Sequence, residues 1–190
     1  MSRFLSKASE SLLPYTPGEQ PQGRKFIKLN TNECPYPPSP KVAEAILAGY
    51  EENSSKIMPL ELANLRLYSD PEERVLIEAI ADHYGVGTNQ VIAGNGSDEI
   101  LGFAFRAFCD QNAPLQFADL TYGFYPALCG LYGIPFKVVP LEEDFTLNIE
   151  PYKNCGNNVI IANPNAPTGM NLPLSAIEEV AASNPDRVVM

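Results

Sequence analysis

The sequence lacks the residue clusters that mark metal sites and cysteine-based catalysis. It contains a single histidine, His83, and four scattered cysteines with no CxxC pair. This pattern gives no support to a zinc site or to a Cys–His nucleophile pair. The four cysteines are Cys34, Cys109, Cys129 and Cys155. We therefore expect free thiols, no bound metal and a cytoplasmic location.

Positive charge and long apolar runs are also scarce. The formal net charge is −10, and lysine and arginine cluster nowhere along the chain. This balance argues against binding to nucleic acid or to an anionic membrane surface. No apolar run approaches the roughly 20 residues that cross a bilayer, and residues 1–13 lack the apolar core of a signal peptide. We expect neither nucleic acid nor membrane as a partner.

Proline, in contrast, is abundant in the first 38 residues, which show little hydrophobic periodicity. We predict that residues 1–38 form an extended N-terminal arm, which must lie against another part of a protein to be ordered. Residues 39–190 have the patterns of regular structure and are predicted to belong to one larger domain. The prolines of the arm are Pro14, Pro17, Pro21, Pro35, Pro37 and Pro38.

Two helix starts and one long apolar helix can be predicted from the pattern that follows the arm. Ser39-Pro40 and Asp70-Pro71 each place a capping residue before a proline, and both are followed by apolar residues at helical spacing. The second of these helices is predicted to end at Gly85. A short strand is expected at 90–93. The next helix, up to Cys109, is apolar almost all round and is predicted to be buried.

The second half of the chain alternates between strands and helices. Short apolar strands separated by helices predict an α/β fold with a doubly wound, mainly parallel sheet. In such sheets ligands collect at the carboxyl ends of the strands. Residues 187–190 form a β-prone run without a closing turn or helix, so we expect the sheet to be incomplete at the C-terminus. The predicted strands are 115–118, 136–139, 158–162 and 187–190, and the predicted helices are 122–132 and 173–182.

Three loops that follow predicted strands carry residues suited to ligand binding. Residues 94–99 (GNGSDE) combine glycines with a helix start, which suits either a phosphate site or an ordinary capped helix. Residues 163–169 (NPNAPTG) form a rigid loop whose amide side chains can donate to a ligand or merely close a turn. Residues 121–125 (TYGFY) offer an aromatic ring that can stack on a flat ligand or pack in the core.

Taken together and in this order, these segments resemble the motifs of histidinol-phosphate aminotransferases, which are class II pyridoxal-phosphate-dependent aminotransferases. The resemblance runs from about Leu12 to Met190 and covers the first half of a family chain. Cys34, Ser69 and Ala166 replace the residues usual in the family, which are asparagine, proline and asparagine. The matching segments are 14–18 (PYxPG), 29–40 (LNxNENPYPPSP), 67–71 (RYPDP), 94–99 (GNGSDE), 121–122 (PTYxxY) and 163–169 (NPNxPTG).

The resemblance implies a type I pyridoxal-phosphate-dependent transferase fold. Residues 39–190 would be the N-terminal part of the large cofactor-binding domain, with the rest of that domain and the small C-terminal domain absent. It also implies a homodimer with active sites at the subunit interface and small-molecule substrates. The reaction would be the transfer of an amino group between histidinol phosphate and 2-oxoglutarate, in histidine biosynthesis, with pyridoxal 5′-phosphate as cofactor.

The matching positions imply which residues bind that cofactor. The backbone amides of Ser97 and Asp98, which follow Gly96, would bind its phosphate. Tyr122 would stack on its pyridine ring. These two segments would therefore share one site.

Four further positions are implied by the resemblance at the edges of the site. Asn165 would contact the phenolic oxygen of the cofactor, because the position used by the family is Ala166 here. Tyr68 would reach the phosphate in the partner subunit's site. Tyr15 and the arm around Asn32 would lie over the substrate.

The family's catalytic motifs have no counterpart in this chain. The family's DEAY motif supplies an aspartate to the pyridine nitrogen, and its SK motif supplies the lysine that forms the Schiff base. Both would follow Met190, so we assign no catalytic residue and expect the 190-residue chain alone to be inactive. The lysines that lie in no matching motif are Lys7, Lys25, Lys28, Lys41, Lys56, Lys137 and Lys153.

Other functions fit part of the same pattern. Aromatic amino-acid transaminases and threonine-phosphate decarboxylases share most of these motifs. A non-catalytic half-domain could associate with a full-length subunit through the arm and the Tyr68 segment. A compact α/β domain could use residues 94–99 to bind phosphate or nucleotide without any Schiff base.

Overall fold

The computed structural model describes residues 27, 29, 33–51, 54–55, 58–59 and 68–190. The chain divides into two compact units, of which the described parts are 27–93 and 94–190, and each is described by itself. Tyr15 and Asn32 lie outside the described residues. The division after residue 38 that the sequence suggests stays a prediction.

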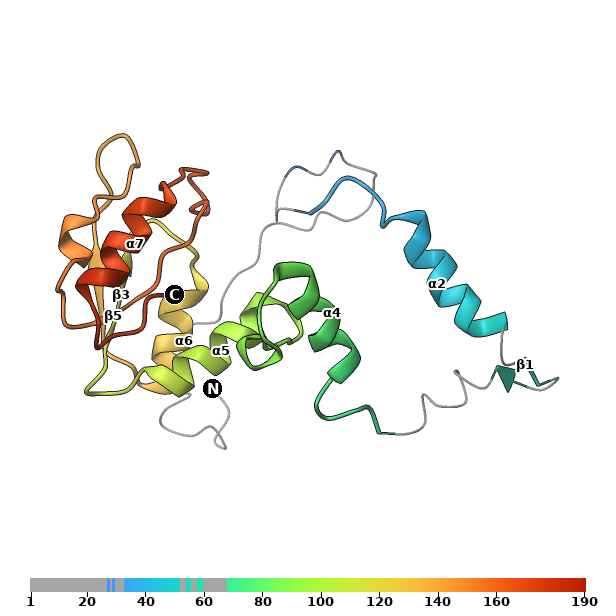
Figure 1. Ribbon diagram of the computed structural model, residues 1–190. Helices are drawn as coiled ribbons and strands as arrows, with labels where there is room; N and C mark the ends of the chain where they lie inside the picture. Colours follow the sequence, from blue (N-terminus) through green and yellow to red (C-terminus); the bar gives the residue numbers. More distant parts are fainter. Residues whose placement is uncertain (1–26, 28, 30–32, 52–53, 56–57, 60–67) are drawn as a thin grey trace, which may run out of the picture. The chain divides into compact units, whose positions relative to one another are not determined.

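The unit formed by residues 27–93 contains two described helices and a short hairpin (Figure 1). Helix α2 spans Pro40–Glu51 and begins at the proline that the sequence predicts. The strands β1 (Ser54–Ser55) and β2 (Met58–Pro59) pair antiparallel. Helix α4 spans Arg74–Tyr84, and its end at Gly85, which has φ 66°, is also as predicted.

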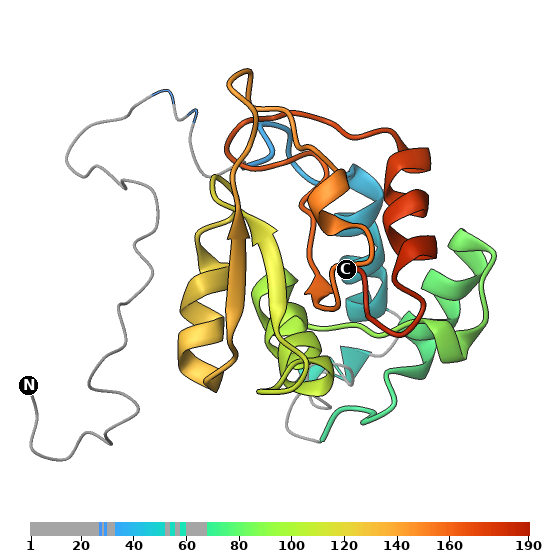
Figure 2. The ribbon, with the colours of Figure 1, turned by 90° about the vertical axis from the view of Figure 1, so that its left-hand side faces the viewer.

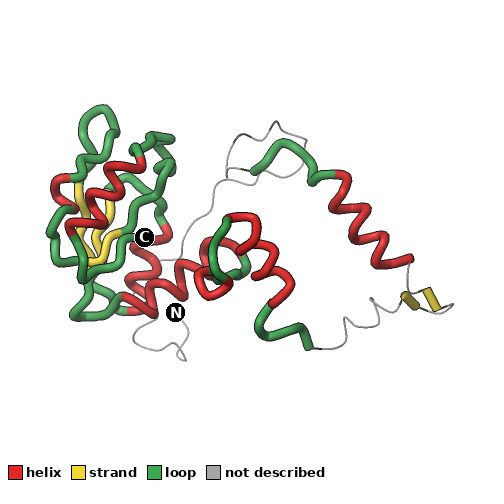
Figure 3. Tube along the Cα trace, in the orientation of Figure 1, coloured by secondary structure: helices red, strands yellow, loops and turns green. Residues whose placement is uncertain are grey.

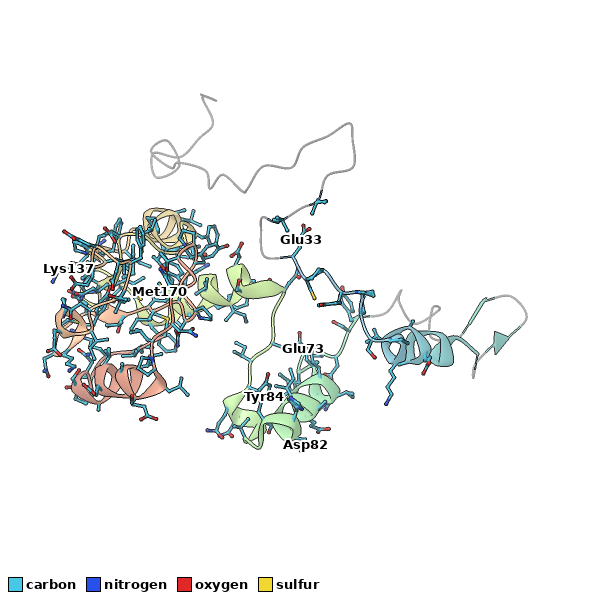
Figure 4. The ribbon with its side chains drawn as sticks, turned by 90° about the horizontal axis from the view of Figure 1, so that it is seen from above. Glu33, Glu73, Asp82, Tyr84, Lys137 and Met170 are labelled. Carbon is cyan, nitrogen blue, oxygen red and sulfur yellow. The ribbon has the colours of Figure 1, made fainter. Side chains whose placement is uncertain are left out.

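Helix α4 begins later than its capping sequence suggests. The Asp70 carboxylate accepts hydrogen bonds from the N–H groups of Glu72 (3.1 Å) and Arg74 (3.3 Å). These bonds, led by the one from Glu72, lower the pKa of Asp70. They close a turn, after which Glu73 takes a left-handed conformation (φ 48°) as the N-cap of the helix. In Figure 4, Glu73 and Tyr84 mark the two ends of α4.

The prediction of a strand at 90–93 is wrong. A 3₁₀ turn, Thr88–Gln90, is followed by irregular backbone up to Ala93. A strand is stabilised by a neighbouring strand, and among the described residues none pairs with this segment. Ile92 is accordingly 70% exposed.

The unit formed by residues 94–190 is built on a parallel sheet, whose strands are yellow in Figure 3. The strand order is β4-β3-β5. The strands are β3 (Leu115–Ala118), β4 (Phe136–Val139) and β5 (Asn158–Val159). Leu115 is in register with Phe136 on one side and with Asn158 on the other. The predicted strand at the end of the chain is present as a parallel bridge between Val159 and Val189.

Helices cover both faces of this sheet, as the α/β prediction requires. They are α5 (Gly96–Phe108), α6 (Phe124–Tyr132) and α7 (Leu174–Ser183), with a 3₁₀ turn at Glu150–Tyr152. Leu115 and Phe117 of β3 belong to a core shared with α5 and α6. Val159 packs with Val180 of α7 in a second core. Figure 2 shows α6 and α7 on opposite sides of the strands.

Helix α5 is less buried than its composition predicts. Gly102 and Phe105 are its buried residues, whereas Phe103 and Phe108 are 50% and 51% exposed. Residue 105 belongs to the core shared with α6 and β3, whereas residues 103 and 108 are not part of that core. Within the described part of its own unit, the helix therefore packs along one face, and the prediction of a helix buried all round is wrong.

The buried thiols predict a loss of stability at alkaline pH. Burial, together with the neighbouring Cys109 thiolate, raises the pKa of Cys129 from 9.0 to about 12. An unfolded thiol ionises near pH 9, so the stabilisation is complete below pH 9 and is lost as pH rises from 9 to 12. The free energy of unfolding should fall by roughly 1.4 kcal/mol per pH unit through this one group.

Urea unfolding at pH 8, 9, 10 and 11 measures this effect. Cys129→Ala lacks the titrating group, so its stability should fall less steeply over the same range. Parallel curves for the two proteins would show that the ionisation of Cys129 is not coupled to unfolding.

Candidate functional site

Three loops of the unit 94–190 carry the residues that the sequence singles out. Two of them follow the carboxyl ends of strands: residues 119–123 after β3 and residues 163–172 after β5. The third, residues 94–99, comprises the two residues before α5 and the first turn of that helix. Each is held by specific hydrogen bonds, which define what its side chains can do.

The start of α5 is shaped by glycines and by one acidic side chain. Gly96 has φ 79°, a conformation that favours glycine, and a Cβ placed on it would meet nothing within 4 Å. At Gly94 a Cβ would lie only 2.7 Å from Ile100 Cδ1, so the loop approaches the helix closely. The Glu99 carboxylate accepts a hydrogen bond from the N–H of Asn95 (2.6 Å).

This geometry leaves donors available at the helix end. The first N–H groups of an α-helix have no partner within the helix, and the helix dipole favours an anion beside them. Ser97 and Asp98 occupy this first turn, and both are exposed. The open space beside Gly96 gives a small anion access to their amides.

Tyr122 lies next to this helix end. Its hydroxyl donates a hydrogen bond to Asp98 Oδ1 at 2.7 Å. Its ring makes an edge contact with Tyr125, with centroids 5.6 Å apart and an interplanar angle of 89°, and a tilted contact with Phe124 at 6.0 Å. The ring is half-buried. The structure thus brings Asp98 and Tyr122 together, as one site requires.

The side chain of Asn165 makes its hydrogen bonds to other groups of the protein. Its side chain is 7% exposed, and its Nδ2 donates to Leu120 O (2.9 Å) and Thr168 Oγ1 (3.0 Å). Its Oδ1 accepts a hydrogen bond from Thr121 Oγ1 (2.8 Å). Because the protein occupies both ends of the amide, Asn165 joins the loop after β5 to the loop after β3. The amide does not point at a ligand with a free donor.

The loop after β5 is closed by a second asparagine. Asn163 Nδ2 donates to Leu172 O (3.1 Å), and its Oδ1 accepts from the N–H of Leu172 (2.9 Å). Gly169, with φ 72°, donates its N–H to Asn165 O at 2.7 Å. Met170, labelled in Figure 4, lies in this loop and accepts the N–H of Asn165 (2.8 Å). The sequence motif therefore encodes a rigid loop.

Sequence reasoning missed Thr121 and Thr168, which bond to the two ends of the Asn165 amide. The usable signal was that both threonines stand beside residues already singled out. A hydroxyl next to a buried amide is a natural hydrogen-bond partner for it.

Tyr68 lies in the other unit, 27–93, and its side chain is fully exposed there. Its predicted contact with a partner subunit's site stays a prediction, as do the roles of Tyr15 and Asn32.

The unit formed by residues 94–190 contains two lysines, Lys137 and Lys153. Lys153 Nζ lies 2.8 Å from both Glu150 Oε1 and Glu179 Oε2. The hydrogen bond that Lys153 donates to Glu150 is the largest of the causes that raise the pKa of the amine, which favours its protonated form. Lys137 lies on β4, at the outer edge of the sheet order, and is exposed (Figure 4).

Two kinds of feature are absent from the residues that the structure describes. None of the described helices is both long and apolar enough to cross a membrane. Within the same part of the chain, no three His, Cys, Asp or Glu side chains are grouped so that they could hold a metal ion.

The parallel sheet with helices on both faces and loops at its strand ends has the fold of the type I pyridoxal-phosphate-dependent aminotransferases. The histidinol-phosphate aminotransferase of Sinorhizobium meliloti, solved in complex with pyridoxal-5′-phosphate, matches 100% of this chain and 50% of its own, with a TM-score of 0.77 and 23% identity. An aspartate aminotransferase mutant of Thermus thermophilus matches 99% of this chain and 50% of its own, with a TM-score of 0.74 and 19% identity.

The chain belongs to the aminotransferase class I and II family, whose model matches residues 24–190. It is 48% identical over 190 residues to the histidinol-phosphate aminotransferase of Pseudomonas putida strain W619, covering 100% of this chain and 51% of that protein. It is 49% identical over 191 residues to histidinol-phosphate aminotransferase 1 of Methylococcus capsulatus, covering 100% and 50%. The chain thus spans about half the length of the curated relatives it matches.

Proposed function

We propose that this chain is part of an enzyme that transfers an amino group between histidinol phosphate and 2-oxoglutarate, with pyridoxal 5′-phosphate as its cofactor. The observation that carries the proposal is the hydrogen bond between Tyr122 and Asp98, which sets an aromatic ring beside a helix N-terminus. The identity of 48% to a histidinol-phosphate aminotransferase along the whole chain supports this choice of substrate.

The residues present fit this cofactor. Its phosphate requires anion donors, and the amides of Ser97 and Asp98 lie at the start of α5, where Gly96 leaves open space. Its flat ring requires an apolar face, which the half-buried Tyr122 supplies next to the same helix end. When bound, the cofactor supplies an electron sink for the bonds of the amino-acid substrate.

The residues of the chain position and hold the ligand. Ser97 and Asp98 would bind the phosphate through their N–H groups, and Tyr122 would lie against the ring. Asn165 bonds to Leu120 and Thr121 and so holds the loop after β5 against the loop after β3. These two loops would form one wall of the site.

We further propose that the complete enzyme is a cytoplasmic homodimer. In that assembly Tyr68 would reach the phosphate of the partner subunit's site, and Tyr15 and Asn32 would lie over the substrate. The full exposure of Tyr68 within its own unit supports a role in contact with another chain.

The test compares ligands with and without phosphate on the 190-residue chain. Pyridoxal 5′-phosphate should bind at least about tenfold more tightly than pyridoxal, because hydrogen bonds to a charged group contribute roughly 1.5–3 kcal/mol each. Equilibrium dialysis or ligand-observed NMR gives both dissociation constants. Equal affinities, or tighter binding of AMP than of pyridoxal 5′-phosphate, would overturn the proposal.

Ser97→Pro removes one of the proposed phosphate donors and keeps the helix. Proline is tolerated in the first turn of a helix because the N–H it lacks has no partner there. We expect binding of pyridoxal 5′-phosphate to weaken about tenfold or more, with little change for pyridoxal. The matched control is Ser97→Ala, which loses the hydroxyl and retains the N–H, and should bind within about twofold of the unmodified chain. If Ser97→Ala weakens binding as much as Ser97→Pro, the donor is the hydroxyl.

A further inference from the structure

The side chain of Asp98 has a partner that the phosphate site does not explain. Its backbone amide is one of the proposed phosphate donors, yet its carboxylate bonds to the hydroxyl of Tyr122 at 2.7 Å. The two residues are 24 positions apart, on α5 and in the loop after β3. The bond therefore joins the helix end to the loop that carries the aromatic ring.

Two contacts of Tyr122 together determine the orientation of its ring. The hydroxyl lies on the axis of the ring, so its bond to Asp98 fixes where the far end of the side chain lies. Rotation about that axis is restricted by the edge contact with Tyr125 at 89°. Since Tyr125 is itself buried, with 5% exposure, it offers a fixed surface. The plane of the Tyr122 ring is thus defined from two directions.

The negative charge of the Asp98 side chain is unfavourable for binding a phosphate nearby. A carboxylate in the first turn of α5 stands beside the place proposed for the phosphate, and like charges repel even in water. Taken alone, this side chain would weaken anion binding. Its presence is explained if the position of the Tyr122 ring contributes more to cofactor binding than the repulsion removes.

We infer that Asp98 is a positioning residue: its carboxylate holds the Tyr122 ring at the orientation in which the ring stacks on the cofactor. The inference rests on the proposed function and assigns to the Asp98 side chain a role separate from that of its amide. It predicts effects of opposite sign for two ligands, pyridoxal 5′-phosphate and inorganic phosphate.

The experiment measures the dissociation constants of these two ligands for five chains. They are the unmodified chain, Asp98→Ala, Asp98→Asn, Tyr122→Phe and the double variant Asp98→Ala/Tyr122→Phe. Asp98→Ala and Tyr122→Phe should each weaken binding of pyridoxal 5′-phosphate about fivefold, which is the size of one modest hydrogen bond. The double variant should be no weaker than either single variant, because both remove the same bond.

Inorganic phosphate should respond in the other direction. Asp98→Ala and Asp98→Asn both remove a negative charge, so they should bind inorganic phosphate about two- to threefold more tightly. Asp98→Asn keeps an oxygen that accepts the Tyr122 hydroxyl, and it should retain the binding of pyridoxal 5′-phosphate that Asp98→Ala loses. Tyr122→Phe tests the same bond without altering α5, and thermal melts of every variant check that the fold is kept.

Three results separate this inference from the proposed function. The positioning role would be overturned if Asp98→Ala bound both ligands more tightly than the unmodified chain. It would also be overturned if the double variant bound pyridoxal 5′-phosphate about 25-fold more weakly, because the two effects would then be independent. The positioning role would also be overturned if Tyr122→Phe and Asp98→Ala bound pyridoxal 5′-phosphate as tightly as the unmodified chain does. In that case the proposed function would still stand, provided that the unmodified chain prefers pyridoxal 5′-phosphate to pyridoxal. An unmodified chain that does not prefer pyridoxal 5′-phosphate to pyridoxal would overturn both.

Discussion

Phe105→Ala should lower the free energy of unfolding of this chain by about 3–5 kcal/mol, the range for a fully buried phenylalanine. Phe105 is 0% exposed and lies where α5, α6 and β3 meet. Its ring packs against Tyr125 with centroids 6.2 Å apart. A loss of this size is a large share of the roughly 5–15 kcal/mol that stabilises a typical domain, so the urea midpoint followed by circular dichroism should fall sharply.

The same helix provides a matched control for this substitution. Phe103 is two residues away and 50% exposed, so Phe103→Ala removes the same atoms from a poorly packed position. Its cost should stay within about 1 kcal/mol. Equal losses for the two variants would mean that Phe105 is not a core residue.

Asn158→Leu should be almost as destabilising, although the leucine side chain has the same number and branching of heavy atoms. Asn158 is 2% exposed, and its Nδ2 donates to Phe108 O at 2.7 Å while its Oδ1 accepts the N–H of Val188 at 3.0 Å. Leucine leaves these two backbone groups without their partner, at a cost of roughly 1–3 kcal/mol each. We expect a loss of about 4 kcal/mol in chemical unfolding.

Hydrogen exchange tests where this loss arises. The amide of Val188 should lose its protection in Asn158→Leu, since its acceptor is gone. Asn171→Leu, at an exposed position, should change stability by less than about 0.5 kcal/mol. Retained protection of Val188 in Asn158→Leu would mean that the amide is held by something other than this side chain.

The sheet of this unit could be predicted from the sequence because its strands are short apolar runs between clear helix signals. The bounds of β3 and β4 agree with the predicted 115–118 and 136–139. The helix stop at Gly85 and the helix start at Pro40 were also predictable, since both depend on backbone preferences of single residues. Local chemistry determines these features.

The features that could not be predicted depend on partners far away in the chain. Residues 90–93 have the pattern of a strand, yet a strand needs a neighbour that the pattern does not reveal. The role of Asn165 depends on Thr121, 44 positions earlier. In the motif alone, an amide that binds a ligand and an amide that binds another loop look the same.

The bonds made by Asn165 have a consequence for how the two loops respond to a ligand. Because one buried amide connects Leu120 and Thr121 to Thr168, the relative position of these segments is set when the chain folds. A molecule that touches both loops meets a preorganised surface, and little conformational entropy is left to lose upon association. For the same reason, a perturbation introduced at Thr121 should be transmitted to Thr168 through a single side chain.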